Sequence, residues 1–152
     1  MTGGRRRLVL LEGSFAICRL PPDAAGPVLG RGALVSATRT SEELSIVCPS
    51  AQSPPGARVE DGWRALKLRG PIPFEETGVL SALATALARR GLSLFALSTF
   101  DTDYVLVREA GLRRAVAALR QAGYSVGAAR PVTAPRARPA RRSNGPRRRG
   151  GT

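Results

Sequence analysis

Residues 95–107 read FALSTFDTDYVLV and decide the fold of the chain. Two apolar runs, 92–98 and 104–107, flank five residues that include two aspartates and two threonines. Apolar runs of this length predict β-strands, and Asp and Thr side chains favour tight turns because they hydrogen-bond to nearby backbone groups. The segment therefore predicts a β-hairpin that is apolar on both faces. We expect helices to cover one face and a partner module or subunit to cover part of the other.

A helix and a strand are predicted on each side of this hairpin. Apolar residues recur at helical spacing over 79–87 and again over about 110–122. Gly91 and Gly123 suit the left-handed position after each helix. A strand over 63–68 precedes the first helix, and a short strand over 124–126 follows the second. The order strand, helix, strand, strand, helix, strand predicts an α+β, ferredoxin-like (βαββαβ) domain over residues 58–129.

The first half of the chain, 8–57, predicts strands with little helix. One long strand, or two pairing pieces broken at Gly13, is followed by β runs over 33–39 and 44–48 that flank the turn residues 40–43. A Pro-Pro-Gly linker then leads into the second half. We expect this half to be a degenerate copy of the same plan, packed beside the second half.

The formal charge of +13 is concentrated near the two ends of the chain. Setting aside Arg5–Arg7 and the eight arginines of 130–152 leaves 13 basic and 11 acidic residues, so the body is nearly balanced. Residues 130–152 are composed mainly of Arg, Pro, Gly, Ala and Ser, which predicts a disordered tail. An Arg-rich arm attracts polyanions, so a nucleic-acid- or ribosome-associated protein acting through this arm is the alternative function.

The sequence lacks the residues that several common catalytic, metal-binding and cofactor-binding sites use. The sequence contains no histidine, and Cys18 and Cys48 lie in apolar runs without metal-ligand spacing, so we expect two reduced core thiols, no metal and no cofactor. No phosphate-binding loop or dinucleotide fingerprint is present, and Asp101 and Asp103 are the only close pair of candidate catalytic carboxylates. No export signal or apolar run of membrane-spanning length is present. The sequence predicts a cytoplasmic protein without enzymatic activity.

The hairpin segment, together with 77–81 and 45–49, resembles the bacterial ACT-domain proteins related to aspartate kinase regulatory regions. The same subfamily includes the cytosolic arginine sensors of eukaryotic nutrient signalling, and the similarity covers roughly 8–127. The resemblance implies tandem ACT modules that hold a small molecule, usually an amino acid, between them and act as an allosteric sensor. Binding either between the two halves or between two protomers of a homodimer fits this arrangement.

The resemblance and the residues together suggest a ligand site at the start of the first helix. Backbone N–H groups around Gly78 suit an α-carboxylate, and Asp103 suits an ammonium group or a cationic side chain. Hydroxyl groups and an aromatic wall would complete the site. The candidate ligand-binding residues are Thr77, Gly78, Val79, Ser98, Thr99, Phe100, Asp101 and Asp103.

Each candidate also has a purely structural interpretation. Asp101 and Asp103 are also suited to building the hairpin turn alone, and Gly78 to serving only as the entry to the helix. Trp63 is interpreted as a packing or interface anchor rather than a platform for a ligand. The first half has no obvious first helix, so a family fold without a ligand stays open as an alternative.

Overall fold

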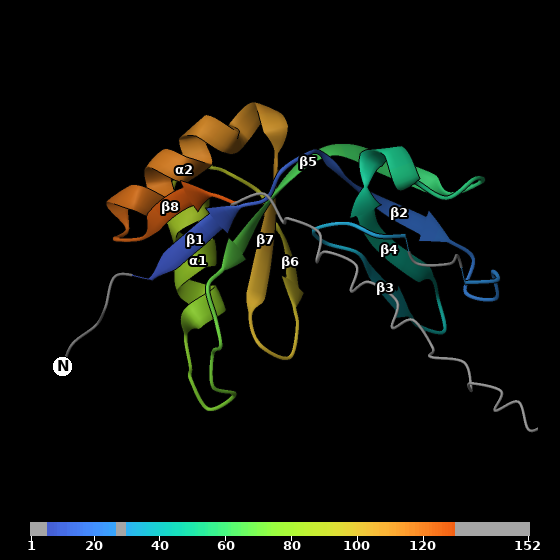
Figure 1. Ribbon diagram of the computed structural model, residues 1–152, viewed down its shortest axis with the longest axis horizontal. Coiled ribbons are helices and arrows are strands. Elements are labelled where there is room, and N and C mark those ends of the chain that lie inside the picture. The colour runs from blue at the N-terminus through green and yellow to red at the C-terminus, as the bar shows by residue number, and fades with distance from the viewer. Residues whose placement is uncertain (1–5, 27–29, 130–152) are drawn as a thin grey trace, which may run out of the picture.

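The computed structural model of the chain describes residues 6–26 and 30–129 (Figure 1). The predicted disordered tail, and with it the predicted nucleic-acid-binding arm, lies outside the described residues. The strands are β1 (Arg7–Leu10), β2 (Phe15–Leu20), β3 (Ser36–Arg39), β4 (Leu44–Pro49), β5 (Arg58–Leu68), β6 (Phe95–Ser98), β7 (Asp103–Arg108) and β8 (Ser125–Ala128). The α-helices are α1 (Val79–Ala88) and α2 (Leu112–Gln121), and single 3-10 turns are η1 (Ser50–Gln52) and η2 (Glu109–Gly111).

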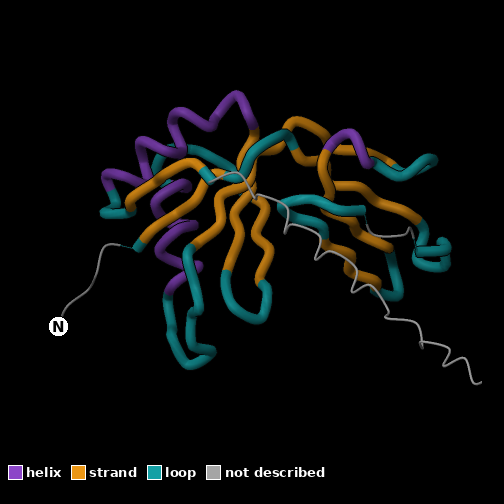
Figure 2. Tube along the Cα trace, in the orientation of Figure 1, coloured by secondary structure: helices purple, strands orange, loops and turns teal. Residues whose placement is uncertain are grey.

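The long strand β5 joins two parts of one continuous sheet. Its first half pairs with β2, and its second half pairs with β1 on one edge and β7 on the other. The helix-covered part, which carries both α-helices, has the strand order β8-β1-β5-β7-β6. The other part has the order β3-β4-β2-β5 and carries only the short 3-10 turn η1, so we call it the helix-free part. Both α-helices lie in the lobe that contains β1 and β8, and β2, β3 and β4 form the other lobe (Figures 1 and 2).

The α+β, ferredoxin-like prediction is confirmed, with one change of strand assignment. β1 was expected in the first half, but it lies between β5 and β8, antiparallel to the former and parallel to the latter. Leu8 is fully buried there beneath the helices, which stabilises this placement. The predicted break at Gly13, which has φ +84°, lets the chain leave this part of the sheet and continue as β2.

Both faces of the helix-covered part are buried over much of their area. Leu66, Leu68 and Val105 face α1 and α2, whereas Ala65 and Leu106 face the other way. On that second face they pack with residues of the helix-free part, including Phe15, Leu34 and Val47. The expectation that helices cover one face and a partner module covers part of the other is therefore confirmed.

Several predicted strand boundaries were wrong. β6 begins at Phe95 rather than at residue 92, and β8 is Ser125–Ala128 rather than 124–126. β5 begins at Arg58 rather than at Trp63, because its polar first residues are held by backbone pairing with β2 and not by apolar burial. β3 is confined to Ser36–Arg39, although a strand was expected from residue 33. Local apolar pattern does not report the start of β5, since pairing with the distant strand β2 sets it. β3 is limited to the residues that pair with β4 across the 40–43 turn.

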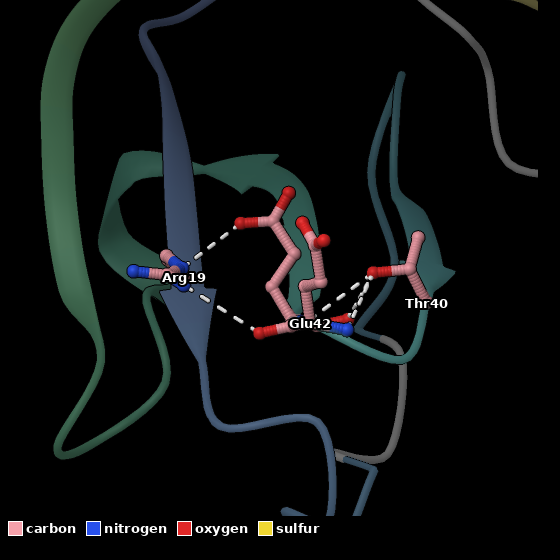
Figure 3. A network of polar contacts seen from close by, with 4 residues as sticks. Arg19, Thr40 and Glu42 are labelled. Carbon is pink, nitrogen blue, oxygen red and sulfur yellow. Dashed lines mark hydrogen bonds and ion pairs between the residues drawn. The ribbon is translucent and has the colours of Figure 1, made fainter.

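The predicted turn between β3 and β4 is confirmed, and side chains stabilise it (Figure 3). Thr40 Oγ1 accepts hydrogen bonds from the backbone N–H groups of Glu42 and Glu43, each at 3.2 Å. From the neighbouring strand β2, Arg19 Nε lies 3.0 Å from a carboxylate oxygen of Glu43. The hairpin is thus tied to the rest of the helix-free part at its exposed end.

Candidate functional site

A pocket of about 280 Å³ lies where the predicted ligand residues meet. The segment before α1, the first turn of α1 and the β6–β7 hairpin form its walls. The lining residues are Ile72, Pro73, Phe74, Glu76, Gly78, Val79, Leu80, Ser98, Thr99, Phe100, Thr102 and Asp103.

The start of α1 forms one wall of the pocket and provides hydrogen-bond donors that have no partner within the helix. Gly78 precedes the helix with φ +79°, a left-handed conformation that favours glycine, and no side chain caps the helix. Ala82 donates the first hydrogen bond of the helix, to the carbonyl of Gly78 at 2.9 Å. The N–H groups of Val79 and Leu80 therefore have no intrahelical partner, and the first turn carries no acidic residue. This end of the helix is suited to an anionic group.

A carboxylate lies on the hairpin wall of the same pocket. Asp103 is the first residue of β7, and its side chain accepts a hydrogen bond of 2.5 Å from the hydroxyl of Ser98, the last residue of β6. The two residues are also directly paired across the hairpin. Because Ser98 holds one carboxylate oxygen, the Asp103 side chain is oriented, and its remaining acceptor capacity suits a cationic group.

The turn that carries these residues is fixed to the body of the protein. The side chain of Thr102 is buried and donates from Oγ1 to the carbonyl of Leu68 at 2.5 Å. Ile72 N–H donates to the carbonyl of Asp101 at 2.8 Å. Gly70 lies so close to this turn that a Cβ atom there would be 2.4 Å from the Asp101 carbonyl oxygen. The β6–β7 turn is therefore a preformed wall.

Two exposed aromatic rings contribute to the pocket. Phe74 and Phe100 are 73% and 79% exposed, yet their rings meet edge to face with centroids 5.1 Å apart. Isolated exposed apolar residues are common, but two large rings in contact beside a pocket form a local apolar patch. Since both side chains keep most of their surface in water, they leave apolar area available to a ligand or to a second protein.

The pocket brings together six of the eight predicted ligand residues. Thr77 does not line it, and Asp101 faces a different pocket on the other side of the turn. Six further residues line the pocket and were not predicted from the sequence: Ile72, Pro73, Phe74, Glu76, Leu80 and Thr102. Phe74 carried a usable signal, because an aromatic residue in a Pro-rich loop before a helix has no place in a periodic core pattern. Glu76 also forms an ion pair with Arg6.

Comparison with known proteins identifies the class to which this fold and pocket belong. A sequence profile described as an ACT domain matches residues 58–121, and a second profile, described as an N-terminal domain, matches residues 13–55. A crystal structure of an Agobacterium tumefaciens protein is 39% identical, with a TM-score of 0.77, over 84% of this chain and 96% of that one. The chain belongs to the ACT-domain family, as the sequence resemblance predicted.

More distant relatives have defined roles. The human and bovine proteins named cytosolic arginine sensor for mTORC1 subunit 1 are each 33% identical over 60 residues, which are 39% of this chain and 18% of theirs. The chain therefore spans less than a fifth of the length of these curated relatives. The regulatory subunit of aspartate kinase from Thermus thermophilus shares the fold with a TM-score of 0.55 at 13% identity, over 76% of this chain and 96% of that one. Neither α1 nor α2 is long and apolar enough to cross a membrane, and the described residues contain no other candidate helix.

Proposed function

We propose that this protein is a non-catalytic, cytoplasmic regulator that binds a free amino acid in the pocket at the start of α1. The observation that carries the proposal is that one small pocket offers hydrogen-bond donors for an anionic group and a carboxylate for a cationic group. Unpaired N–H groups at Val79 and Leu80 suit an α-carboxylate, and the oriented carboxylate of Asp103 suits an ammonium group or a cationic side chain. A free amino acid carries both kinds of group.

The size and walls of the pocket also support a small ligand. A volume of about 280 Å³ is at the lower end of the range for ligand pockets, so a single amino acid is a better match than a nucleotide. Ile72 and Val79 give apolar surface beside the polar groups, and the ring of Phe100 lies at the edge. We propose that the side chain of the amino acid packs against this apolar surface.

Binding without reaction is the simplest use of these groups. Ser98 is hydrogen-bonded to Asp103, but the sequence has no histidine to serve as a base in the usual triad arrangement. The described residues hold no cluster of metal-ligating side chains. Bound ligand would therefore act by shifting a docking equilibrium, in line with the regulatory role named for the aspartate kinase relatives.

A second protomer is the best candidate for completing the site. No described residue of the helix-free part lines this pocket, so its described residues do not enclose a ligand there. Phe74 and Phe100 keep most of their apolar surface exposed beside it. We therefore extend the proposal to a homodimer in which the ligand lies between the ACT modules of two chains and stabilises their association.

A thermal-shift screen of the full chain against the twenty amino acids tests the proposal. A ligand that binds only the folded state at 100 times its Kd stabilises that state by about 2.7 kcal/mol, which raises the Tm by several degrees. We expect one amino acid, or a chemically related few, to give such a shift. Asp103→Asn should abolish the shift, whereas Glu75→Gln, at a neighbouring carboxylate that does not line the pocket, should retain it.

Two results would contradict the proposal. One is the absence of a shift with all twenty amino acids, which would favour an ACT fold without this ligand. The other is an unchanged shift in Asp103→Asn, which would place the ligand elsewhere and leave Asp103 as a turn residue.

A further inference from the structure

A second and larger pocket, of about 620 Å³, lies on the face of the helix-covered part that is opposite α1 and α2. Strands β1, β5 and β8 form its floor, and the β6–β7 turn forms one wall. The lining residues are Arg7, Val9, Lys67, Arg69, Gly70, Pro71, Asp101, Thr102, Ala128 and Ala129. Its volume falls within the range of small-molecule sites.

Strand register brings the cations of this pocket onto one face. Val9 pairs with Lys67 across β1 and β5, and the N–H of Arg69 donates to the carbonyl of Arg7 at 2.8 Å. Since side chains alternate between faces along a strand, and Leu8 and Leu68 point to the helices, these four residues point away from them. Arg7, Lys67 and Arg69 therefore gather at one end of the sheet.

The three cations form no ion pair with a carboxylate of the described residues. Among the described residues, Arg6, Arg19, Arg64 and Arg108 each form an ion pair, whereas Arg7, Lys67 and Arg69 form none. The Lys67 ammonium instead lies 5.7 Å from the centroid of the Tyr104 ring. Asp101, at the rim, is the single carboxylate of the lining, so the pocket carries a formal charge of +2.

Small residues lie between the charged groups of the pocket. Gly127 of β8 pairs with Val9, and a Cβ atom there would lie 3.5 Å from the guanidinium of Arg7. Val9, Pro71 and Ala128 add small apolar surfaces between the charged groups. The pocket thus combines converging positive charge with room for a short carbon skeleton.

We propose that this pocket is a binding site for a small molecule that carries at least two negative charges on phosphate or carboxylate groups. Opposite charge favours binding because each anionic oxygen gains a charge-assisted hydrogen bond from a guanidinium or ammonium group. The site is separate from the amino-acid pocket, since among the residues named for the two pockets only Thr102 lines both. The inference does not depend on the proposed amino-acid function.

Lys67 gives this proposal a direct chemical test, because it is the only lysine in the sequence. Acetylation of the full chain by an amine-reactive reagent is followed by mass spectrometry of the peptide that contains Lys67. Pyrophosphate, inorganic phosphate, citrate and succinate are compared with sodium chloride at equal ionic strength. We expect at least one of the four anions to slow acetylation of Lys67 tenfold or more, and the effective anion distinguishes phosphate from carboxylate ligands. Unchanged acetylation with all four overturns the proposal.

Calorimetric titration of the full chain with the most protective anion distinguishes binding in this pocket from binding to the other basic segments. We expect Arg69→Gln to weaken binding about tenfold, which corresponds to about 1.4 kcal/mol. Asp101→Asn should tighten binding, since it removes the one negative charge of the lining. The matched control is Arg113→Gln, an exposed cation of α2 outside the pocket, which should leave the affinity unchanged. Equal losses in Arg69→Gln and Arg113→Gln would show non-specific attraction to positive charge and overturn the proposal.

Discussion

Gly70 shows how a single missing side chain fixes the wall between the two pockets. A Cβ atom at this position would be 2.4 Å from the Asp101 carbonyl oxygen, a contact that the backbone has to move to relieve. We therefore expect Gly70→Ala to lower the free energy of unfolding by about 1–3 kcal/mol, as overpacking does. Gly26→Ala, where the nearest atom would be at 3.7 Å, is the control and should change it by less than about 0.5 kcal/mol. Equal urea-unfolding midpoints for the two variants would contradict the close approach.

The buried thiol of Cys48 makes a prediction about alkaline pH. Burial, followed by the neighbouring Cys18, raises the pKa of Cys48 from its ordinary value of 9.0 to about 11. Between these values the unfolded state binds fewer protons than the folded state, so the free energy of unfolding falls as the pH rises from about 9 to 11. The slope reaches at most about 1.4 kcal/mol per pH unit, and this thiol adds no pH dependence below 9.

Urea unfolding between pH 8 and 11 checks this prediction against Cys48→Ala. Burial also raises the pKa of Tyr124, so both proteins are expected to lose stability at high pH. The wild-type curve should fall more steeply, and the difference between the two curves is the contribution of Cys48. Parallel curves would show that the thiol titrates normally in the folded protein.

At the scale of single elements, sequence periodicity predicted the helices and strands whose determining residues are close together in the sequence. The helices α1 and α2 and the β6–β7 hairpin follow from apolar spacing, from glycines at the helix ends and from turn residues that are close in sequence. The partners of β1 and the polar start of β5 were not predictable, because they depend on pairing across about 40 residues or more. Asp101 and Asp103 have the same side chain two residues apart, so their sequence did not show that the turn places them in different pockets.

The placement of β1 leads to a prediction about stability. Leu8 is fully buried between β5, β8 and the helices, so Leu8→Ala should cost about 2–5 kcal/mol, as truncation in a packed core does. Leu20→Ala, at the half-buried end of β2, is expected to cost less. Chemical denaturation of the two variants measures both costs. A loss below about 1 kcal/mol for Leu8→Ala would contradict the placement of β1 in the helix-covered part.

At the scale of the whole molecule, the β6–β7 turn separates two binding environments of different chemistry. One side offers helix N–H groups with Asp103, and the other side offers three unpaired cations. The helix-free part covers the sheet through Phe15 and Val47, and none of its described residues outside β5 lines either pocket. Its role is to support β5 and to bury one face of the sheet. Regulation would then depend on contacts that the helix-covered part makes with its ligands and with a second protomer.

The most direct test of the amino-acid site is a titration of the ¹⁵N-labelled full chain, followed by the backbone amide signals in two-dimensional NMR. The amino acid that gives the largest thermal shift is added in steps. The account predicts the largest changes at the amides of Gly78, Val79 and Leu80, together with Asp103, because the α-carboxylate and the ammonium group contact these positions. Changes confined to residues 67–70, or spread evenly over the chain, would contradict the assignment of the ligand to the start of α1.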